Sequence, residues 1–232
     1  MSLGSGQWYR RQALERAGLR DGMTLLDLAT GTGLVARSAM HILSDPRAVI
    51  GLDPSRGMLG EARGRLGRGL VQGRAEDLPF ADERFDVVSM GYALRHMADL
   101  GVAFRECLRV LRPGGRLLIL EISRPRSALG REMIRIYFTR ALPLIMRIST
   151  RSVPAQMLTR YYWDTIDSSA APDTILEALR RAGFVDVERR VFGGLLSEFV
   201  AAKRTHPLAP TPPLTAPNGG AARPVAADTD AG

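Results

Sequence analysis

Two acidic residues and a glycine turn are the first features of the chain whose types and spacing could do chemistry. Asp27 lies near the end of one apolar run, with Gly31 and Gly33 just after it, and Asp53 ends the next apolar run. With Ala36, the glycines match the G-x-G-x-x-G/A spacing of turns whose backbone approaches a nucleotide-like ligand closely. Asp53 stands where an acid accepts hydrogen bonds from both ribose hydroxyls. The spacing predicts a site for a ligand that contains a nucleoside.

The position of Asp27 distinguishes two classes of cofactor that such a turn can hold. NAD and S-adenosylmethionine both carry a ribose that Asp53 could bind. A carboxylate four residues before Gly31 is of little use to a pyrophosphate, whereas it attracts a ligand that carries an ammonium and a sulfonium group. We therefore expect S-adenosylmethionine, with an NAD(P)-dependent oxidoreductase as the alternative.

A second group of chemically capable residues follows the apolar run that ends at Met90. Tyr92, Arg95 and His96 lie within six residues of it. Methyl transfer needs an acceptor made nucleophilic by a nearby base or polarising group, and a histidine titrates near neutral pH. We expect these three residues to be catalytic. The alternative is that His96 is a solvent-facing loop residue and that Arg95 pairs with a local acid such as Asp99.

The elements that must position these residues alternate between apolar runs and helical patterns. Five runs predict buried strands, at residues 23–29, 47–53, 69–73, 85–90 and 116–122, and helical patterns cover 34–43, 58–65 and 99–111. Apolar runs without alternation are typical of parallel strands covered on both faces. A further helix over 172–184 and strands at 185–191 and 195–203 complete the pattern. The sequence predicts an α/β fold with a doubly wound, mostly parallel, seven-stranded sheet.

The strand and helix pattern is interrupted once and then ends before the C-terminus. Residues 1–204 form one predicted domain, with a helical lid insert over about 123–172, and the Pro/Ala/Gly-rich residues 205–232 predict a disordered tail. Between Arg131 and Arg151 the insert carries five arginines and one glutamate among apolar residues. Such a segment could line the entry of an apolar substrate, lie peripherally on an anionic membrane surface, or be a lid with solvated arginines.

The composition of the chain argues against several classes of ligand and partner. The 232 residues are 45% hydrophobic, and the net charge of +8 comes almost wholly from arginine, because Lys203 is the only lysine. Cys107 is the one cysteine and the three histidines are widely separated, so we expect no disulfide and no metal site. The arginines are dispersed and form no recognised RNA motif, so we expect no nucleic acid. Without a secretion signal or an apolar run of about 18 residues, a cytoplasmic protein is expected.

Several motifs in order resemble a known family. The segments "DLATGTG", "GLDPSRGML", "GRAEDLPFADERFDVVSM" and "LRVLRPGGRLLILE" resemble the class I S-adenosylmethionine-dependent methyltransferases. Within that superfamily, "YALRHMAD", "LEISRP" and the opening "SLGSGQWYRR" resemble the ubiquinone/menaquinone biosynthesis C-methyltransferases. That family also carries a Tyr-Asp segment before the opening stretch, so either translation begins upstream of Met1 or the site closes differently.

The resemblance implies a cofactor site in which each part of S-adenosylmethionine has a partner. Asp27 and the turn backbone would face the methionyl part, Asp53 the ribose, Met58 one face of the adenine, and Asp77 the adenine amino group. The residues it implies as cofactor-binding are Asp27, Ala29, Thr30, Gly31, Gly33, Asp53, Met58, Glu76, Asp77 and Leu78. A solvated loop acid is the alternative for Asp77, and plain core packing is the alternative for Met58.

The resemblance also implies an acceptor. Arg95 matches the arginine of the family's Arg-Asn pair, whereas His96 replaces the asparagine, and Tyr161 would line the acceptor pocket or pack in an aromatic core. We expect a small, apolar, ring-bearing acceptor, first of all a demethylmenaquinol or polyprenyl benzoquinol methylated on carbon. An O- or N-methyltransferase of specialised metabolism that uses His96 as its base is the alternative. A homodimer is compatible with the sequence.

Overall fold

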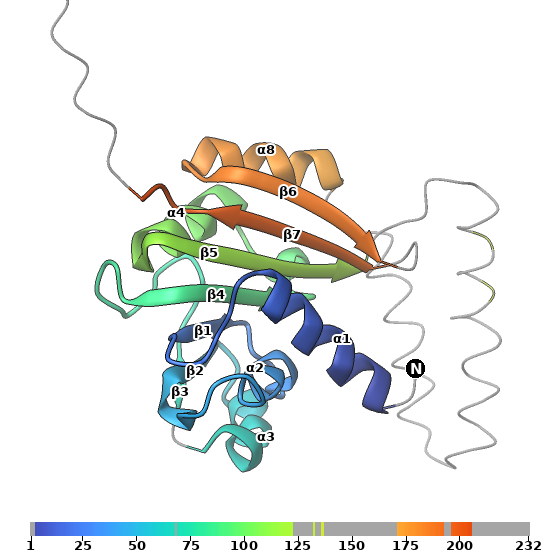
Figure 1. Ribbon diagram of the computed structural model, residues 1–232, viewed down its shortest axis with the longest axis vertical. Coiled ribbons are helices and arrows are strands. Elements are labelled where there is room, and N and C mark those ends of the chain that lie inside the picture. Colours follow the sequence, from blue (N-terminus) through green and yellow to red (C-terminus); the bar gives the residue numbers. More distant parts are fainter. Residues whose placement is uncertain are drawn as a thin grey trace, which may run out of the picture.

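The strands form one sheet in the order β3-β2-β1-β4-β5-β7-β6 (Figure 1). The computed structural model describes residues 3–67, 69–122, 132, 136, 171–192 and 196–205. The strands are β1 (Leu25–Leu28), β2 (Val49–Asp53), β3 (Leu70–Gln72), β4 (Phe85–Gly91), β5 (Leu111–Ile122), β6 (Val185–Phe192) and β7 (Leu196–Ala202). The helices are α1 (Leu3–Arg16), α2 (Leu34–Ala39), α3 (Arg56–Leu66), α4 (Leu100–Val110) and α8 (Pro172–Ala182), with short 3₁₀ turns η1 (Pro46–Ala48) and η2 (Leu94–His96).

The pairing of the strands fixes where a ligand can bind. β1 pairs in parallel with both β2 and β4, β2 pairs in parallel with β3, and β4 pairs in parallel with β5. β7 runs antiparallel to both β5 and β6. The chain builds outward from β1 in one direction to β3 and then in the other through β4, so the strand order reverses between β1 and β4. In open α/β sheets, ligands bind beyond the carboxyl ends of the strands at this point.

Each face of the sheet is covered by its own layer of helices. Side chains of α4 and α8 pack with alternate strand residues such as Leu26, Val88 and Ile119 on one face. On the other face, α1, α2 and α3 pack with the intervening residues, for example Leu25 and Leu118. Figure 1 shows α1 crossing the sheet with its N-terminal end beyond the tips of the strands. The site at those tips is therefore bordered by α1.

The predicted α/β fold with a seven-stranded, mostly parallel sheet is confirmed. Helix α1 has no counterpart in the sequence prediction. The predicted helix over 34–43 was too long, because α2 ends at Ala39 and a turn follows it. The predicted strand at 116–122 was too short, because β5 already begins at Leu111. Most of the predicted lid insert, and the predicted tail from residue 206 onward, lie outside the described residues.

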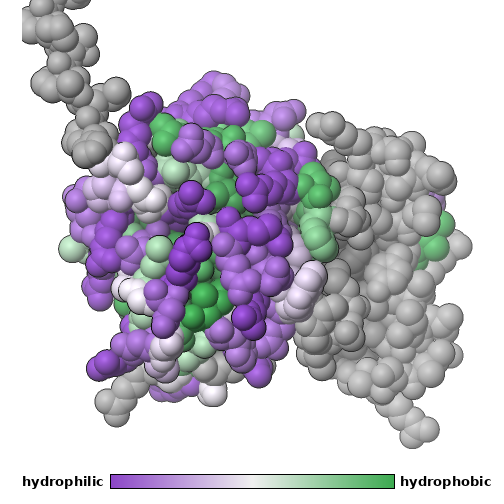
Figure 2. Space-filling view, in the orientation of Figure 1, coloured by the Kyte–Doolittle hydropathy of each residue, from purple (hydrophilic) through white to green (hydrophobic). Residues whose placement is uncertain are grey.

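The described residues present a predominantly hydrophilic surface on the face drawn in Figure 2. Hydrophobic residues form small separate areas there. The large hydrophobic side chains with more than two fifths of their surface exposed include Trp8, Leu34, Met58, Val191 and Phe192. None of the helices within the described ranges combines the length and the apolar character needed to cross a bilayer.

Candidate functional site at the carboxyl ends of β1, β2, β4 and β5

Asp27 is a buried carboxylate that three groups of the chain itself hold in place. Its side chain is 1% exposed. Oδ2 accepts hydrogen bonds from Thr30 Oγ1 at 2.6 Å and from the Ala36 backbone N–H at 3.2 Å. Oδ1 accepts from Ser89 Oγ on the neighbouring strand β4 at 2.6 Å. Asp27 thus ties the glycine turn, the first turn of α2 and β4 together.

Burial also sets the protonation equilibrium of this carboxyl group. Removal from water raises the pKa of Asp27 to about 6, because an anion is poorly stabilised in an apolar interior. The hydrogen bonds from Ser89, Thr30 and Ala36 oppose this shift, and the charge of Asp53 adds to it. A cation bound nearby would favour the ionised form, so the environment suits a ligand with a positive charge.

Asp53 lies at the end of β2 and links β2 to the glycine turn. Its Oδ2 accepts from the Gly31 backbone N–H at 2.9 Å, and its Oδ1 accepts from the Ser55 backbone N–H at 2.8 Å. The Thr30 backbone N–H donates to the Leu52 carbonyl at 3.0 Å. Each carboxylate oxygen keeps a second lone pair, which is what two ribose hydroxyls would require.

The backbone is in the left-handed region at the ends of both central strands. Gly31 has φ of 56° and Gly33 of 81°, and two non-glycine residues share this conformation, Ala29 at 49° after β1 and Tyr92 at 58° after β4. A side chain disfavours such angles, and residues that adopt them cluster at functional sites. The turn and the start of the β4 loop are therefore held in shape by their surroundings.

Two features near the turn are compatible with a nucleoside cofactor. Among the described residues, a Cβ placed on Gly31 would meet only the Ala29 carbonyl oxygen within 4 Å, at 3.9 Å, so this part of the structure leaves the backbone open to a ligand. Met58 on α3 is 45% exposed, which leaves its thioether available to pack on an aromatic base. The predicted methionyl and adenine contacts stay predictions. For the methionyl part, both oxygens of Asp27 already accept hydrogen bonds within the chain.

The predicted adenine-binding residues lie in the connection between β3 and β4. Asp77 is exposed and pairs through its backbone with Arg74, whereas Leu78 is buried. Glu76 accepts from the Ala98 backbone N–H at 2.9 Å. Burial raises the pKa of Glu76, but this hydrogen bond and the nearby Arg74 outweigh it and hold the pKa below its usual range. Of the two acids, Asp77 is the more exposed.

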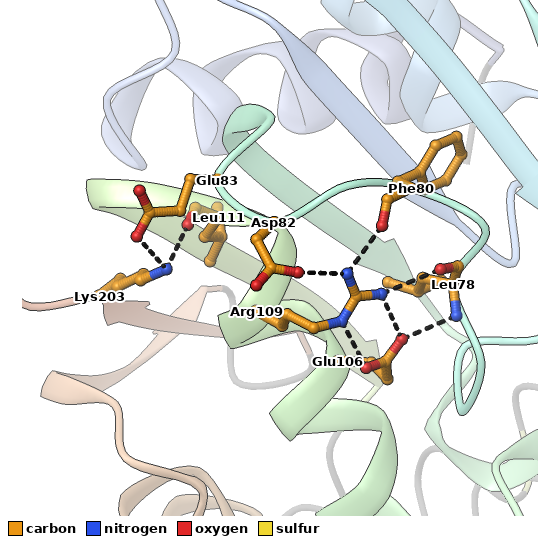
Figure 3. Close-up of polar contacts among 8 residues, drawn as sticks. All are labelled: Leu78, Phe80, Asp82, Glu83, Glu106, Arg109, Leu111 and Lys203. Atoms are coloured by element: carbon orange, nitrogen blue, oxygen red, sulfur yellow. Dashed lines mark hydrogen bonds and ion pairs between the residues drawn. The ribbon is translucent and has the colours of Figure 1, made fainter.

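Arg109 of α4 holds this connection against the helix (Figure 3). Its guanidinium donates to the Phe80 carbonyl at 2.7 Å and to the Leu78 carbonyl at 3.0 Å. It also pairs with Asp82 at 2.8 Å and with Glu106 at 2.7 Å. Glu106 in turn accepts from the Leu78 backbone N–H at 2.8 Å. Two side chains of α4 therefore fix the backbone next to Asp77.

The three predicted catalytic residues come together beyond β4. The Tyr92 backbone N–H donates to the Leu120 carbonyl at 2.7 Å, and Arg95 Nη1 donates to the Tyr92 carbonyl at 2.7 Å. Asp99 is not the acid that pairs with Arg95: it caps α4 by accepting from the Val102 backbone N–H at 3.0 Å, and no ion pair joins it to Arg95 in the described part of the chain. The wider alternative, a pairing of Arg95 with a local acid, stays open, because the charge of Arg95 acts on Glu121.

His96 is exposed at the end of η2. Partial burial and the positive charge of Arg95 lower its pKa, while Asp53 acts in the opposite direction. The imidazole is therefore neutral at neutral pH and able to accept a proton. Its exposure fits the loop-residue alternative as well as the catalytic one.

Glu121 is a site residue that the sequence did not reveal. It lies near the carboxyl end of β5 and is 6% exposed. Its Oε1 accepts from the Ile122 backbone N–H at 3.1 Å, whereas its buried Oε2 has no hydrogen-bond partner in the described structure. Arg95 has a buried donor, its Nε, which also lacks a hydrogen-bond partner among the described residues. Burial raises the pKa of Glu121, and the hydrogen bond from the Ile122 backbone, the charge of Arg95 and the Leu94 backbone partly offset this.

Two further polar residues enter the site without a sequence prediction. Ser89 contacts Asp27 from β4, and Arg10 of α1 has a buried Nε without a hydrogen-bond partner among the described residues. The signal for Ser89 was a hydroxyl within an otherwise apolar strand. No group of metal-ligating side chains occurs within the ranges that the structure describes. Tyr161 and nearly all of the basic segment 131–151 lie outside those ranges.

Comparison with known proteins identifies the family of this chain. The model of the ubiE/COQ5 methyltransferase family matches residues 1–203. The ubiquinone/menaquinone biosynthesis C-methyltransferase UbiE of Shewanella oneidensis is 34% identical over 195 residues, covering 81% of this chain and 76% of the relative. The protein of the same name from Shewanella putrefaciens is 33% identical with the same coverage.

Solved structures share the fold. A SAM-dependent methyltransferase from Aquifex aeolicus superposes with a TM-score of 0.60 at 17% identity, covering 83% of this chain and 88% of the other. Phosphoethanolamine N-methyltransferase 2 of Haemonchus contortus, in complex with S-adenosyl-L-methionine, gives a TM-score of 0.57 at 20% identity, covering 85% of this chain and 53% of the other. At these identities the likeness shows the fold alone.

Proposed function

Because this chain belongs to the ubiE/COQ5 methyltransferase family and is an S-adenosylmethionine-dependent methyltransferase, we propose that it methylates a ring carbon of a demethylmenaquinol or a related polyprenyl benzoquinol. The observation that carries this proposal is the similarity to relatives named for C-methylation in ubiquinone and menaquinone biosynthesis. The polar groups at the ends of β4 and β5 support it, because they suit an acceptor that carries a hydroxyl group.

The chain's part in the reaction is to hold the two reactants in line. When bound, S-adenosylmethionine supplies a methyl group on a positively charged sulfur that is already a good leaving group. Asp53 and the Gly31 turn would hold the nucleoside, and Asp77 the adenine amino group. The acceptor would then lie beyond β4 and β5, next to Arg95 and Glu121, with water excluded.

Two buried atoms without a hydrogen-bond partner in the described structure support a proposal for how a quinol would bind. A hydroxyl group both donates and accepts, so in the proposed complex it would donate to Glu121 Oε2 and accept from Arg95 Nε. Arg95 would stabilise the negative charge that develops on the oxygen. The raised pKa of Glu121 makes its carboxylate a better proton acceptor than an exposed glutamate.

The proposed step balances as follows. The hydroxyl O–H bond breaks and its proton moves to Glu121. Electrons of the ring then form the bond from the adjacent carbon to the methyl group, while the methyl–sulfur bond breaks. The ring carbon loses its hydrogen as a proton, the oxygen is protonated again, and one proton is released to solvent.

An activity assay tests this proposal. The purified protein is incubated with demethylmenaquinol and with S-adenosylmethionine that bears a deuterated methyl group. Mass spectrometry should find a labelled product that oxidises to a quinone with the label retained. A quinol methylated on oxygen cannot form that quinone, so a labelled product that resists oxidation would contradict C-methylation. The absence of any labelled product would contradict the quinol acceptor.

Two variants in the same assay separate the candidate bases. Glu121→Gln should lower kcat by about 10²–10⁴-fold, the range that a general base contributes, with little change in KM for the cofactor. His96→Asn should keep measurable activity. Loss of all turnover in His96→Asn, with Glu121→Gln active, would instead support the alternative in which His96 is the base of an O- or N-methyltransferase.

A further inference from the structure

The loop between β4 and α4 carries two of the predicted catalytic residues, Arg95 and His96. Its turn η2 is closed by a hydrogen bond within the loop, from the His96 backbone N–H to the Ala93 carbonyl at 2.9 Å. Such a hydrogen bond shapes the loop but does not place it relative to the rest of the molecule. Contacts with other segments must therefore set the position of Arg95 and His96.

Glu76 provides such a contact from the connection between β3 and β4. Its Oε1 accepts from the Ala98 backbone N–H at 2.9 Å, 22 residues further along the chain. The Glu76 side chain is 17% exposed, and Arg74 lies 3.5 Å from its other oxygen. Burial raises the pKa of Glu76, but hydrogen bonds from the backbones of Ala98 and of Glu76 itself, with the charge of Arg74, hold the pKa below its usual range. The carboxylate is therefore ionised at neutral pH, and its hydrogen bond with Ala98 is charge-assisted.

The same connection places Asp77 between two tethered neighbours. Glu76 on one side is tied to Ala98. Leu78 on the other side donates its backbone N–H to Glu106 of α4 at 2.8 Å (Figure 3). Asp77 itself is exposed. A ligand that binds Asp77 therefore contacts a turn whose two flanks are fixed to neighbouring segments, one of which is the loop after β4.

This loop also lies near the ribose end of the site. Partial burial and the charge of Arg95 lower the pKa of His96, whereas the charge of Asp53 raises it. An electrostatic interaction of this kind requires proximity, because it weakens with distance. The loop thus borders both the place proposed for the nucleoside and the place proposed for the acceptor.

We infer that Glu76 is a positioning residue that holds the loop of Arg95 and His96 in place and passes cofactor binding at Asp77 to that loop. Adenine held by Asp77 restricts the turn, and Glu76 then restricts Ala98, because a ligand that orders one segment also orders the segments coupled to it. The Glu76 carboxylate, implied by the resemblance as a cofactor ligand, is assigned to the loop instead. This role rests on the proposed adenine contact of Asp77, and it is the same for any acceptor.

Amide hydrogen exchange, measured by mass spectrometry with and without S-adenosylhomocysteine, tests this role. In the wild type, saturating S-adenosylhomocysteine should slow the exchange of residues 92–98. In the free protein, Glu76→Ala should speed exchange at Ala98 about 10–100-fold, as expected when a charge-assisted hydrogen bond is lost. The same variant should lose the slowing caused by the ligand. Its calorimetric affinity for S-adenosylhomocysteine should fall less than about five-fold, the size of a weak coupling between sites.

Two further variants control for the loss of a carboxylate and for the fold. Asp21→Ala removes a comparable hydrogen bond, from the Ser44 backbone N–H at 2.7 Å, at the opposite ends of β1 and β2. It should leave the exchange of residues 92–98 and its response to the ligand as in the wild type. Glu76→Gln keeps an oxygen that accepts from Ala98, so it should retain the response and speed exchange at Ala98 only about two- to ten-fold. Its comparison with the wild type keeps the test decisive if Glu76→Ala does not fold.

Each contradicting result has its own meaning. Unchanged exchange at Ala98 in the Glu76 variants would show that the hydrogen bond does not hold the loop. Slowing by S-adenosylhomocysteine that persists in Glu76→Ala, or that is absent from the wild type, would show that Glu76 does not pass cofactor binding to the loop. A loss of affinity above about ten-fold in Glu76→Ala would make Glu76 a direct ligand of the cofactor. Because these measurements contain no acceptor, failure to methylate a quinol would leave the role of Glu76 untouched.

Discussion

At the residue scale, Asp27 makes stability depend on pH in an unusual direction. Its pKa in the folded chain is about 6, above the ordinary value of 3.8 that applies when the chain is unfolded. The folded state therefore binds this proton more tightly, and the contribution of Asp27 to stability decreases as the pH rises from about 4 to about 6. Two pKa units correspond to roughly 3 kcal/mol. Acidic groups with lowered pKa values, such as Asp86, act in the opposite sense: their contribution to stability increases as the pH rises.

Asp27→Asn isolates this effect, because asparagine does not titrate. The free energy of unfolding of the wild type minus that of Asp27→Asn should fall by roughly 3 kcal/mol between about pH 4 and pH 7 in urea denaturation. Ser89→Ala, which removes a hydrogen bond that lowers the pKa, should move the transition to higher pH. A difference that stays constant across this range would contradict the raised pKa.

The sequence revealed the residues that directly follow the predicted strands and turns better than those whose role depends on burial between elements. Asp27 and Asp53 were predictable because each ends a strand near a glycine turn, and the structure brings them together through Gly31. Glu121 and Arg10 were not, because their environments are made by segments far apart in the chain. A buried carboxylate and an arginine on the inner face of a helix become recognisable only when the neighbouring elements are in place.

At the element scale, α4 should control cofactor affinity without touching the cofactor. If Asp77 binds the adenine, loosening the loop that Arg109 holds will weaken binding. Arg109→Met removes hydrogen bonds to two carbonyls, to Leu78 and Phe80, and leaves Glu106 without its cation. We expect destabilisation of about 1–3 kcal/mol and about ten-fold weaker binding of S-adenosylhomocysteine, measured by thermal melting and calorimetry.

Arg112→Met is the control for this variant. It removes an ion pair of 2.7 Å with Asp86, which lies in β4 and not in the loop that carries Asp77. This variant should therefore affect only stability. Equal and unchanged affinities in the two variants would mean that the loop next to Asp77 does not contribute to cofactor binding.

The elements themselves were predicted unevenly. Continuous apolar runs identified the strands of the sheet, because both faces of a parallel sheet are covered. Helix α1 was missed because it has few apolar residues. Its buried positions Tyr9, Ala13 and Leu14 are surrounded by polar residues, and its first turns contain Gly4 and Gly6. Packing against α2 and the ion pair of Arg16 with Glu198 stabilise it instead of local propensity.

At the scale of the whole molecule, the account depends on the ends of four strands meeting around one cofactor. β1 and β2 contribute Asp27 and Asp53, β4 leads into Tyr92 and Arg95, and β5 contributes Glu121. The reversal of strand order between β1 and β4 creates this meeting point. The cofactor is therefore the feature whose identity decides every role assigned to these residues.

Calorimetric titration of the purified wild-type chain with S-adenosylhomocysteine, and separately with NADH, tests this most directly. We predict saturable binding of S-adenosylhomocysteine that raises the melting temperature, since a ligand of the folded state stabilises it, and no binding heat with NADH. Saturable binding of NADH together with indifference to S-adenosylhomocysteine would contradict the account.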